Sequence, residues 1–180
     1  MQSYFANRSC DPFSDRSTPC TLGNYVSYSL KATEARDVVA ALDFAKHQNV
    51  RILVRNTGHD YLGRSTGAGA LAIWTQGLKD ISFTQWSDQY YSGPAVKVGA
   101  GVLGYEILEA AHAQGLAVVS GECATVGLAG GFTQGGGHSA LSTAFGLGAD
   151  QTLAFEVRTA SLFRPPVRPE LTLPLLGSYS

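Results

Sequence analysis

The chain has 180 residues, of which 44% are hydrophobic and 15% charged, and its formal net charge is −1. Such a balance of charges provides no electrostatic footprint for nucleic acid or an anionic membrane, and the apolar content excludes an intrinsically disordered chain. No apolar window of about 18 residues is present, so no membrane-spanning helix is predicted. We therefore expect a folded protein with neither nucleic acid nor a membrane as partner, while the oligomeric state stays open.

Residues 1–23 are predicted to form an irregular N-terminal segment. Cys10 and Cys20 flank a loop of prolines and serines that is short enough to be closed by a disulfide, and Asn7-Arg8-Ser9 is a glycosylation sequon. Both features are typical of secreted proteins, but the N-terminus lacks the basic and then apolar order of a secretory signal. A chance sequon with two unrelated thiols explains the segment equally well, so the compartment stays open.

Residues 24–160 contain the regular elements. Residues 24–30 alternate as a strand does, and residues 34–47 carry apolar side chains at helical spacing, with Thr33 able to cap the helix. Residues 50–54 form a short apolar run, so the three segments predict a strand–helix–strand unit of an α/β or α+β domain.

The remaining predicted elements alternate further along the chain. Strands are predicted at residues 71–74, 81–83, 95–98 and 116–119. A second helix is predicted at residues 104–114, and Gly115 ends it where a positive φ is needed.

Residues 161–180 differ in composition from everything before them and are predicted to be a divergent, proline-rich tail. Four prolines are predicted to keep this stretch out of any central strand or helix, namely Pro165, Pro166, Pro169 and Pro174. Four leucines make it more apolar than a solvated tail should be, namely Leu171, Leu173, Leu175 and Leu176. A splicing or reading-frame change just after residue 160, or an artefact of gene-model translation, would produce such a discontinuity.

Two glycine-rich segments, residues 55–69 and 121–139, each follow a predicted strand and are the candidate binding sites. Glycines let backbone N–H groups converge on an anion, and nearby hydroxyls can donate to the same oxygens, those of Ser65, Thr66, Thr125 and Thr133. Neither segment matches a Walker loop or a Rossmann fingerprint. The segments therefore favour a dinucleotide bound by another architecture, with tight connections between packed strands as the alternative.

His59 and Cys123 lie inside these glycine-rich segments, each just after a predicted strand. Imidazole and thiolate are both nucleophiles that are accessible near neutral pH, so each could react with a cofactor whose phosphates the segments hold. A zinc site of His59, Cys123 and His138 is the rival interpretation. The paired short spacing of zinc ligands is missing, so no metal is predicted.

Two motifs carry a resemblance to a known family. They are Arg-Asn-Thr-Gly-His-Asp-Tyr-Leu-Gly-Arg-Ser at residues 55–65 and Gly-Glu-Cys-Ala-Thr-Val-Gly-Leu-Ala-Gly-Gly-Phe-Thr-Gln-Gly-Gly-Gly-His-Ser at residues 121–139. In this order the motifs resemble FAD-linked oxidoreductases of the vanillyl-alcohol oxidase and p-cresol methylhydroxylase (PCMH) type, in the berberine-bridge-enzyme-like branch. The resemblance extends from about Phe5 to Thr159. Within the family, the sequence is most similar to fungal secondary-metabolism members, including oxidases of ergot-alkaloid pathways.

The resemblance implies an α+β fold, the N-terminal part of a two-subdomain FAD-binding (PCMH-type) domain with the substrate domain absent. It implies FAD held by two covalent bonds, from the His59 imidazole to the flavin 8α-methyl and from the Cys123 sulfur to flavin C6. It implies further cofactor contacts at Asn56, Thr57, Gly58, Asp60, Gly63, Arg64, Ser65, Thr125, Val126, Gly127, Gly130, Gly131, Gly135 and Gly136. The family reaction is hydride transfer from a small secondary metabolite to the flavin, with dioxygen as the usual acceptor.

The sequence departs from the resembled family in its extent. Relatives are two to three times longer, are often secreted, and carry the substrate-facing base in a part that is missing here. No catalytic residue is therefore predicted, and capping or solvated roles are favoured for Asp60, Glu122 and Asp150. The expectation is a fragment that is inactive as it stands, with a non-catalytic remnant that binds no flavin as the alternative.

Overall fold

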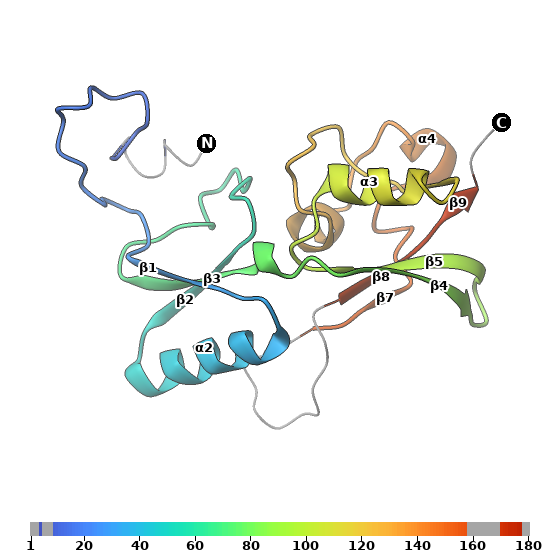
Figure 1. Cartoon of the computed structure of the whole chain (residues 1–180), viewed down its shortest axis with the longest axis horizontal. Coiled ribbons are helices and arrows are strands. Elements are labelled where there is room, and N and C mark those ends of the chain that lie inside the picture. The colour runs from blue at the N-terminus through green and yellow to red at the C-terminus, as the bar shows by residue number, and fades with distance from the viewer. Residues whose placement is uncertain (1–3, 5–8, 158–169, 178–180) are drawn as a thin grey trace. The chain divides into compact units, whose positions relative to one another are not determined.

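The computed structural model of the chain describes residues 4, 9–157 and 170–177, and it divides into unit 1, Met1–Gly77, and unit 2, Leu78–Ser180 (Figure 1). Both units combine helices with sheets, which confirms the predicted α+β class. Within the described part of the chain, no helix has the length and apolar character needed to cross a membrane.

Unit 1 is a small parallel sheet with one long helix. Its elements are β1 (Tyr28–Lys31), α2 (Ala35–Gln48), β2 (Arg51–Arg55), β3 (Ala70–Trp74) and the 3-10 turn η1 (Thr75–Gly77). The strand order is β1-β3-β2, and both outer strands run parallel to β3. The predicted strand–helix–strand unit is therefore confirmed, with β3 inserted between its two strands.

The two ends of the first predicted strand–helix pair differ from the prediction. Residues 24–27 precede the strand, because Tyr25 N–H donates to Leu22 O (2.8 Å) in a turn rather than joining the sheet. Glu34, not Thr33, is the N-cap of α2. The Thr33 backbone N–H and hydroxyl donate to the Asp37 carboxylate at 2.8 and 3.0 Å. The backbone hydrogen bond from Thr33 is the main cause that lowers the pKa of Asp37.

Unit 2 is built on a four-stranded antiparallel sheet in the order β4-β5-β8-β7. Its elements are β4 (Ile81–Ser87), β5 (Ser92–Gly99), α3 (Gly104–His112), β6 (Leu116–Ala117), the π-helical turn η2 (Leu128–Phe132), α4 (Ser142–Phe145), β7 (Ala154–Phe155), β8 (Glu170–Pro174) and β9 (Leu176–Gly177). The core consists of Val96, Val98, Val102, Ile107, Ala111, Val118, Leu128, Leu173 and Leu175. Gly115 follows α3 with φ +69°, as predicted, whereas the predicted strand 116–119 is reduced to β6.

The prediction that the C-terminal prolines keep the tail out of a central strand is wrong for residues 170–174. β8 lies between β5 and β7, with Val96 opposite Leu173 on one side and Ala154 opposite Thr172 on the other. Leu173 and Leu175 are buried, at 3% and 4% exposed, so these two leucines complete the core. Pro165, Pro166 and Pro169 lie outside the described residues.

Pro174 is tolerated in β8 because of its position. It is the last residue of the strand and lies opposite Ala95 of β5, whereas β7 pairs with β8 only at residues 171–172. A missing N–H at a strand end interrupts little of the ladder.

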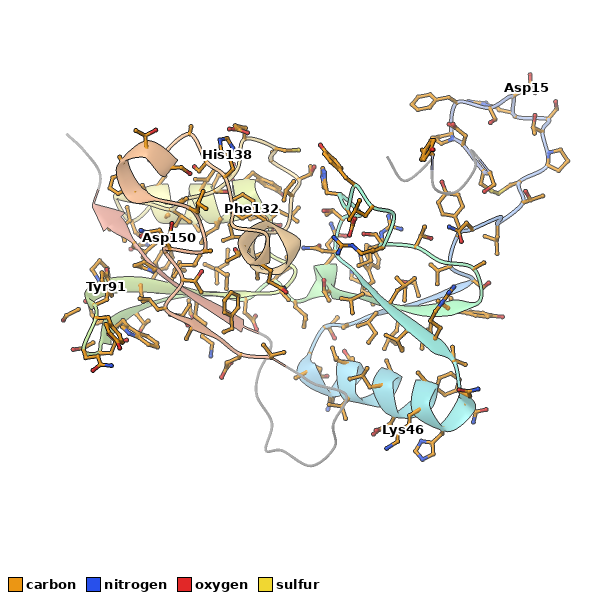
Figure 2. All side chains as sticks on the ribbon, turned by 180° about the vertical axis from the view of Figure 1, so that it is seen from behind. Asp15, Lys46, Tyr91, Phe132, His138 and Asp150 are labelled. Carbon is orange, nitrogen blue, oxygen red and sulfur yellow. A yellow bond between two sulfur atoms is a disulfide. The ribbon has the colours of Figure 1, made fainter. Side chains whose placement is uncertain are left out.

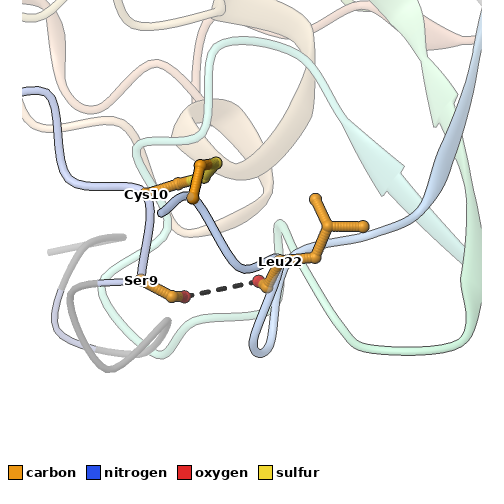
Figure 3. Close-up of a disulfide and its surroundings, with 4 residues drawn as sticks. Ser9, Cys10 and Leu22 are labelled. Carbon is orange, nitrogen blue, oxygen red and sulfur yellow. Dashed lines mark hydrogen bonds between the residues drawn. A yellow bond between two sulfur atoms is a disulfide. The ribbon is translucent and has the colours of Figure 1, made fainter. Parts of the chain in front are cut away.

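The N-terminal segment contains the predicted disulfide, between Cys10 and Cys20. Beside it the Ser9 hydroxyl donates to Leu22 O at 3.3 Å (Figure 3). Asn7, the acceptor of the sequon, lies outside the described residues.

Candidate functional site

The first candidate site is the loop after β2, at the carboxyl end of the parallel sheet in unit 1. Arg55 and Lys31 both lie opposite Trp74 in the last row of the sheet. The Lys31 ammonium lies 5.6 Å from the centroid of the Trp74 ring, and Trp74 Nε1 donates to Asn56 O at 2.8 Å. Ligands of parallel sheets bind at this end of the strands. The strand ends thus fix the backbone where the glycine-rich segment begins.

The His59 loop, residues 58–64, follows this anchored start. Gly58 and Gly63 take φ +83° and +76°, which glycine adopts without the penalty of a side chain. Between them Asp60 accepts hydrogen bonds from Leu62 N–H and Arg64 Nε, both at 2.6 Å. Partial burial alone would raise the pKa of Asp60, but these bonds and the Arg64 charge lower it below its ordinary value. The imidazole of His59 is exposed.

The second candidate site is the Cys123 loop, residues 121–127, in unit 2. The first N–H groups of α3 are bonded to it, since Gly104 N–H donates to Val126 O at 2.9 Å and Tyr105 N–H to Ala124 O at 3.2 Å. Cys123 is exposed and not disulfide-bonded, and its sulfur lies 3.7 Å from Thr125 Oγ1. The loop carbonyls therefore satisfy helix N–H groups that would otherwise lack partners, and this fixes the backbone that carries the thiol.

Glycines in and just after the second segment serve two different purposes. The Phe132 side chain, labelled in Figure 2, is packed so closely that a Cβ at Gly121, Gly137 or Gly148 would lie 3.1, 2.9 or 3.0 Å from its ring. A Cβ at Gly130 or Gly131 would meet nothing within 4 Å. The first three glycines are therefore required by packing, whereas the other two leave backbone open to a ligand.

Two hydroxyls that were predicted to donate to phosphate are used inside the protein. Thr133 is 1% exposed and donates to Leu128 O at 2.7 Å. Thr66 is 8% exposed, donates to Asn24 O at 3.3 Å and accepts from Val26 N–H at 3.2 Å. The prediction is wrong for these two residues, because a buried hydroxyl must find a partner within the fold.

Asp150, Glu122 and His138, the other titratable residues of interest, all belong to unit 2. Asp150 accepts from Leu147 N–H at 2.8 Å, which is the capping role expected for it. Glu122 Oε1 lies 3.8 Å from His138 Nδ1, and both side chains are exposed (Figure 2). Among the described residues no group of three His, Cys, Asp or Glu could hold a metal ion.

The structure distributes the predicted site residues over the two units. Unit 1 contains Asn56, Thr57, Gly58, His59, Asp60, Gly63, Arg64 and Ser65, and unit 2 contains Cys123, Thr125, Val126, Gly127, Gly130, Gly131, Gly135 and Gly136. Each unit thus presents one exposed nucleophile on a glycine-bordered loop. Sequence analysis missed the packing role of Phe132 and the loop bonds of α3, since neither leaves a motif.

Comparison with known proteins identifies related sequences over most of the chain. A family model described as FAD binding domain matches residues 26–161. The FAD-linked oxidoreductase ZEB1 of Gibberella zeae is 61% identical over 160 residues, which cover 89% of this chain and 28% of that protein. The VAO-type flavoprotein oxidase VAO615 of Thermothelomyces thermophilus is 55% identical over 161 residues, with the same two shares. The chain therefore spans little more than a quarter of these relatives.

Solved structures share the fold. The crystal structure of the VAO-type flavoprotein MtVAO615 from Myceliophthora thermophila superposes with a TM-score of 0.91 and 45% identity, over 97% of this chain and 36% of that one. A glucooligosaccharide oxidase from Acremonium strictum superposes with a TM-score of 0.69 and 19% identity, over 86% of this chain and 36% of that one.

Proposed function

The chain belongs to the FAD binding domain family of VAO-type oxidoreductases, and on this premise we propose that it anchors FAD covalently through His59 and Cys123. The observation that carries the proposal is the exposure of both nucleophiles on glycine-bordered loops. A buried imidazole or thiol could not reach a ring that arrives from solvent. His59 of unit 1 and Cys123 of unit 2 would each form one covalent bond to the flavin.

The residues around each nucleophile fit this cofactor. Gly130 and Gly131 leave main chain uncovered in unit 2, which suits a flat ring or a diphosphate. In unit 1, Arg64 uses Nε for Asp60 while its side chain stays 74% exposed, so the rest of the guanidinium can pair with a phosphate. Thr125 can donate to the Cys123 sulfur and orient it.

A flavin linked to one cysteine and one histidine is named for a protein of the same fold. The oxidase from Acremonium strictum carries a 6-S-cysteinyl, 8α-N1-histidyl FAD. When bound, FAD supplies a ring that accepts a hydride from an activated C–H bond or an alcohol. For the protein as a whole we propose oxidation of a small secondary metabolite, with dioxygen as the final acceptor.

The test is acid-stable flavin on the purified chain. We expect yellow colour and flavin fluorescence to remain with protein that has been precipitated by acid, and a flavin mass on the two peptides that contain His59 and Cys123. His59→Ala and Cys123→Ala should each keep the other link, and the double variant should lose all acid-stable flavin. His47→Ala is the matched control, since His47 lies on α2 and its ring Nδ1–H donates to Asp43 O at 2.8 Å. A wild-type precipitate without flavin would refute covalent anchoring.

A further inference from the structure

We propose that Asp60 is a positioning residue, whose carboxylate holds the His59 loop in the conformation that presents His59 to FAD. This inference rests on the proposed function and deepens it. It also changes the expectation for Asp60, which the family resemblance placed among the residues that contact the cofactor.

The contacts of Asp60 are all within its own loop. Oδ1 accepts from Leu62 N–H at 2.6 Å, and Oδ2 accepts from Arg64 Nε at 2.6 Å. The Asp60 side chain is only 19% exposed, whereas Tyr61 and Leu62 are 73% and 70% exposed. Both oxygens are therefore engaged by neighbours within four residues.

The His59 loop lies outside the hydrophobic core of unit 1. None of residues 58–64 is buried, so the loop takes no support from a hydrophobic core. Gly58 and Gly63 at its ends have positive φ, and glycine populates many other backbone conformations in the absence of constraints. Bonds from the Asp60 carboxylate to both the main chain and a guanidinium constrain the loop to this conformation.

The charge of Asp60 also argues against direct contact with the cofactor. An ionised carboxylate is only an acceptor, and it repels the diphosphate of FAD. Its pairing with Arg64 compensates that charge and at the same time sets the orientation of the guanidinium. Asp60 thus supports the loop and Arg64, while His59 and Arg64 remain exposed for the cofactor.

Loss of this support should reduce the fraction of molecules in the binding-competent conformation. The apparent dissociation constant rises by the inverse of that fraction, whereas the end point at saturating ligand is unchanged. A positioning role therefore predicts a change in the FAD concentration needed for attachment and no change in final stoichiometry.

The test titrates FAD onto the flavin-free chain and measures the initial rate at which acid-stable flavin forms, because attachment is irreversible and only this rate reports the binding that precedes it. We expect Asp60→Ala to raise the half-saturating FAD concentration about tenfold, with wild-type stoichiometry at saturation. Asp60→Asn keeps an oxygen for Leu62 N–H but loses the charge. Its half-saturating FAD concentration should therefore lie between those of the wild type and Asp60→Ala. The matched control is Asp88→Ala, in the β4–β5 hairpin. Asp88 accepts from Trp86 Nε1 and from the Tyr90 and Tyr91 N–H groups, each at 2.8 Å, and no predicted site residue is nearby in sequence.

The outcomes separate this inference from the proposed function. Equal half-saturation for wild type and Asp60→Ala, or folded Asp60→Ala that loads no flavin at any concentration, would overturn the positioning role and leave covalent anchoring intact. A wild-type chain that takes up no flavin would instead overturn the proposed function. Amide hydrogen exchange of the flavin-free chain then decides the role of Asp60: faster exchange at Leu62 in Asp60→Ala, but not in Asp88→Ala, supports it, and unchanged exchange overturns it.

Discussion

The two nucleophile loops are held by different kinds of interaction. The His59 loop is fixed by one side chain, Asp60, through bonds to Leu62 and Arg64. The Cys123 loop is fixed by main-chain hydrogen bonds to the start of α3 and contains Gly121, which packs against Phe132. A loop tied by a carboxylate responds to charge and to a single substitution, whereas a loop tied by main chain responds to the stability of the unit around it.

The hydrophobic cores of the two units differ in size, and the larger core is that of unit 2. The core cluster of unit 2 contains nine buried side chains, including several valines and leucines. The buried cluster of unit 1 is limited to Ala32, Ala41 and Ile73, with half-buried neighbours on α2, β2 and β3. Burial of apolar area stabilises in proportion to its extent, so unit 2 should be the more stable body. The presentation of Cys123 should therefore depend on packing, and that of His59 on local electrostatics.

The largest loss of stability is expected in the core of unit 2, and it tests whether packing supports that unit. Leu173→Ala removes a side chain that is 3% exposed and lies opposite Val96, and should lower the free energy of unfolding by about 2–5 kcal/mol. Urea denaturation measures it. Leu62→Ala is the control, since Leu62 is 70% exposed and its loss should change stability by no more than about 0.5 kcal/mol. An unchanged midpoint for Leu173→Ala would contradict the packing of β8 in this core.

An effect of about the same size is expected at Gly137, a packed glycine of the second glycine-rich segment. Gly137 has φ +76°, and a Cβ there would lie 2.9 Å from the Phe132 ring and 3.0 Å from Gly148 Cα. Gly137→Ala should therefore cost about 1–2 kcal/mol for the left-handed backbone and about 1–3 kcal/mol for overpacking. Gly115→Ala separates the two, because Gly115 has φ +69° with nothing within 4 Å of its Cβ. Equal losses of stability for the two variants, measured by urea denaturation, would show that the packing around Phe132 yields.

Elements that are determined by interactions between neighbouring residues were predicted from sequence, and elements that depend on distant residues were not. The strand–helix–strand unit and helix α3 were predicted because their periodicity and their glycine or polar ends lie within a few residues. β8 was missed because proline content was weighed without knowledge of which position each proline occupies in the sheet. Pro174 at a strand end is compatible with a ladder that a mid-strand proline would break.

The candidate site was predicted in part for a similar reason. His59 and Cys123 stand in recognisable motifs, and the structure leaves both exposed, although their attachment to FAD stays a prediction. The hydroxyls of Thr66 and Thr133 could not be assigned from sequence, since their partners Asn24 and Leu128 are brought to them by the fold. The role of Asp60 likewise depends on which N–H groups the loop turns toward it.

The smallest expected effect is a pH dependence of the His59 loop that the Cys123 loop should not share. Hydrogen bonds and the Arg64 charge lower the pKa of Asp60 below its ordinary value of 3.8 against the opposing effect of partial burial, so the folded loop favours the ionised carboxylate. Its contribution is complete above the ordinary value and is lost as the pH falls through the lowered one. We expect the protection factor of the Leu62 amide to fall between about pH 5 and about pH 2 in the wild type. Asp60→Asn, which has no proton to gain, should show a flat profile over that range. The Gly104 amide, bonded to Val126 O, should be flat in both proteins until unit 2 itself unfolds. A Leu62 profile that is equally flat in wild type and variant would mean that main chain, and not charge, holds the His59 loop.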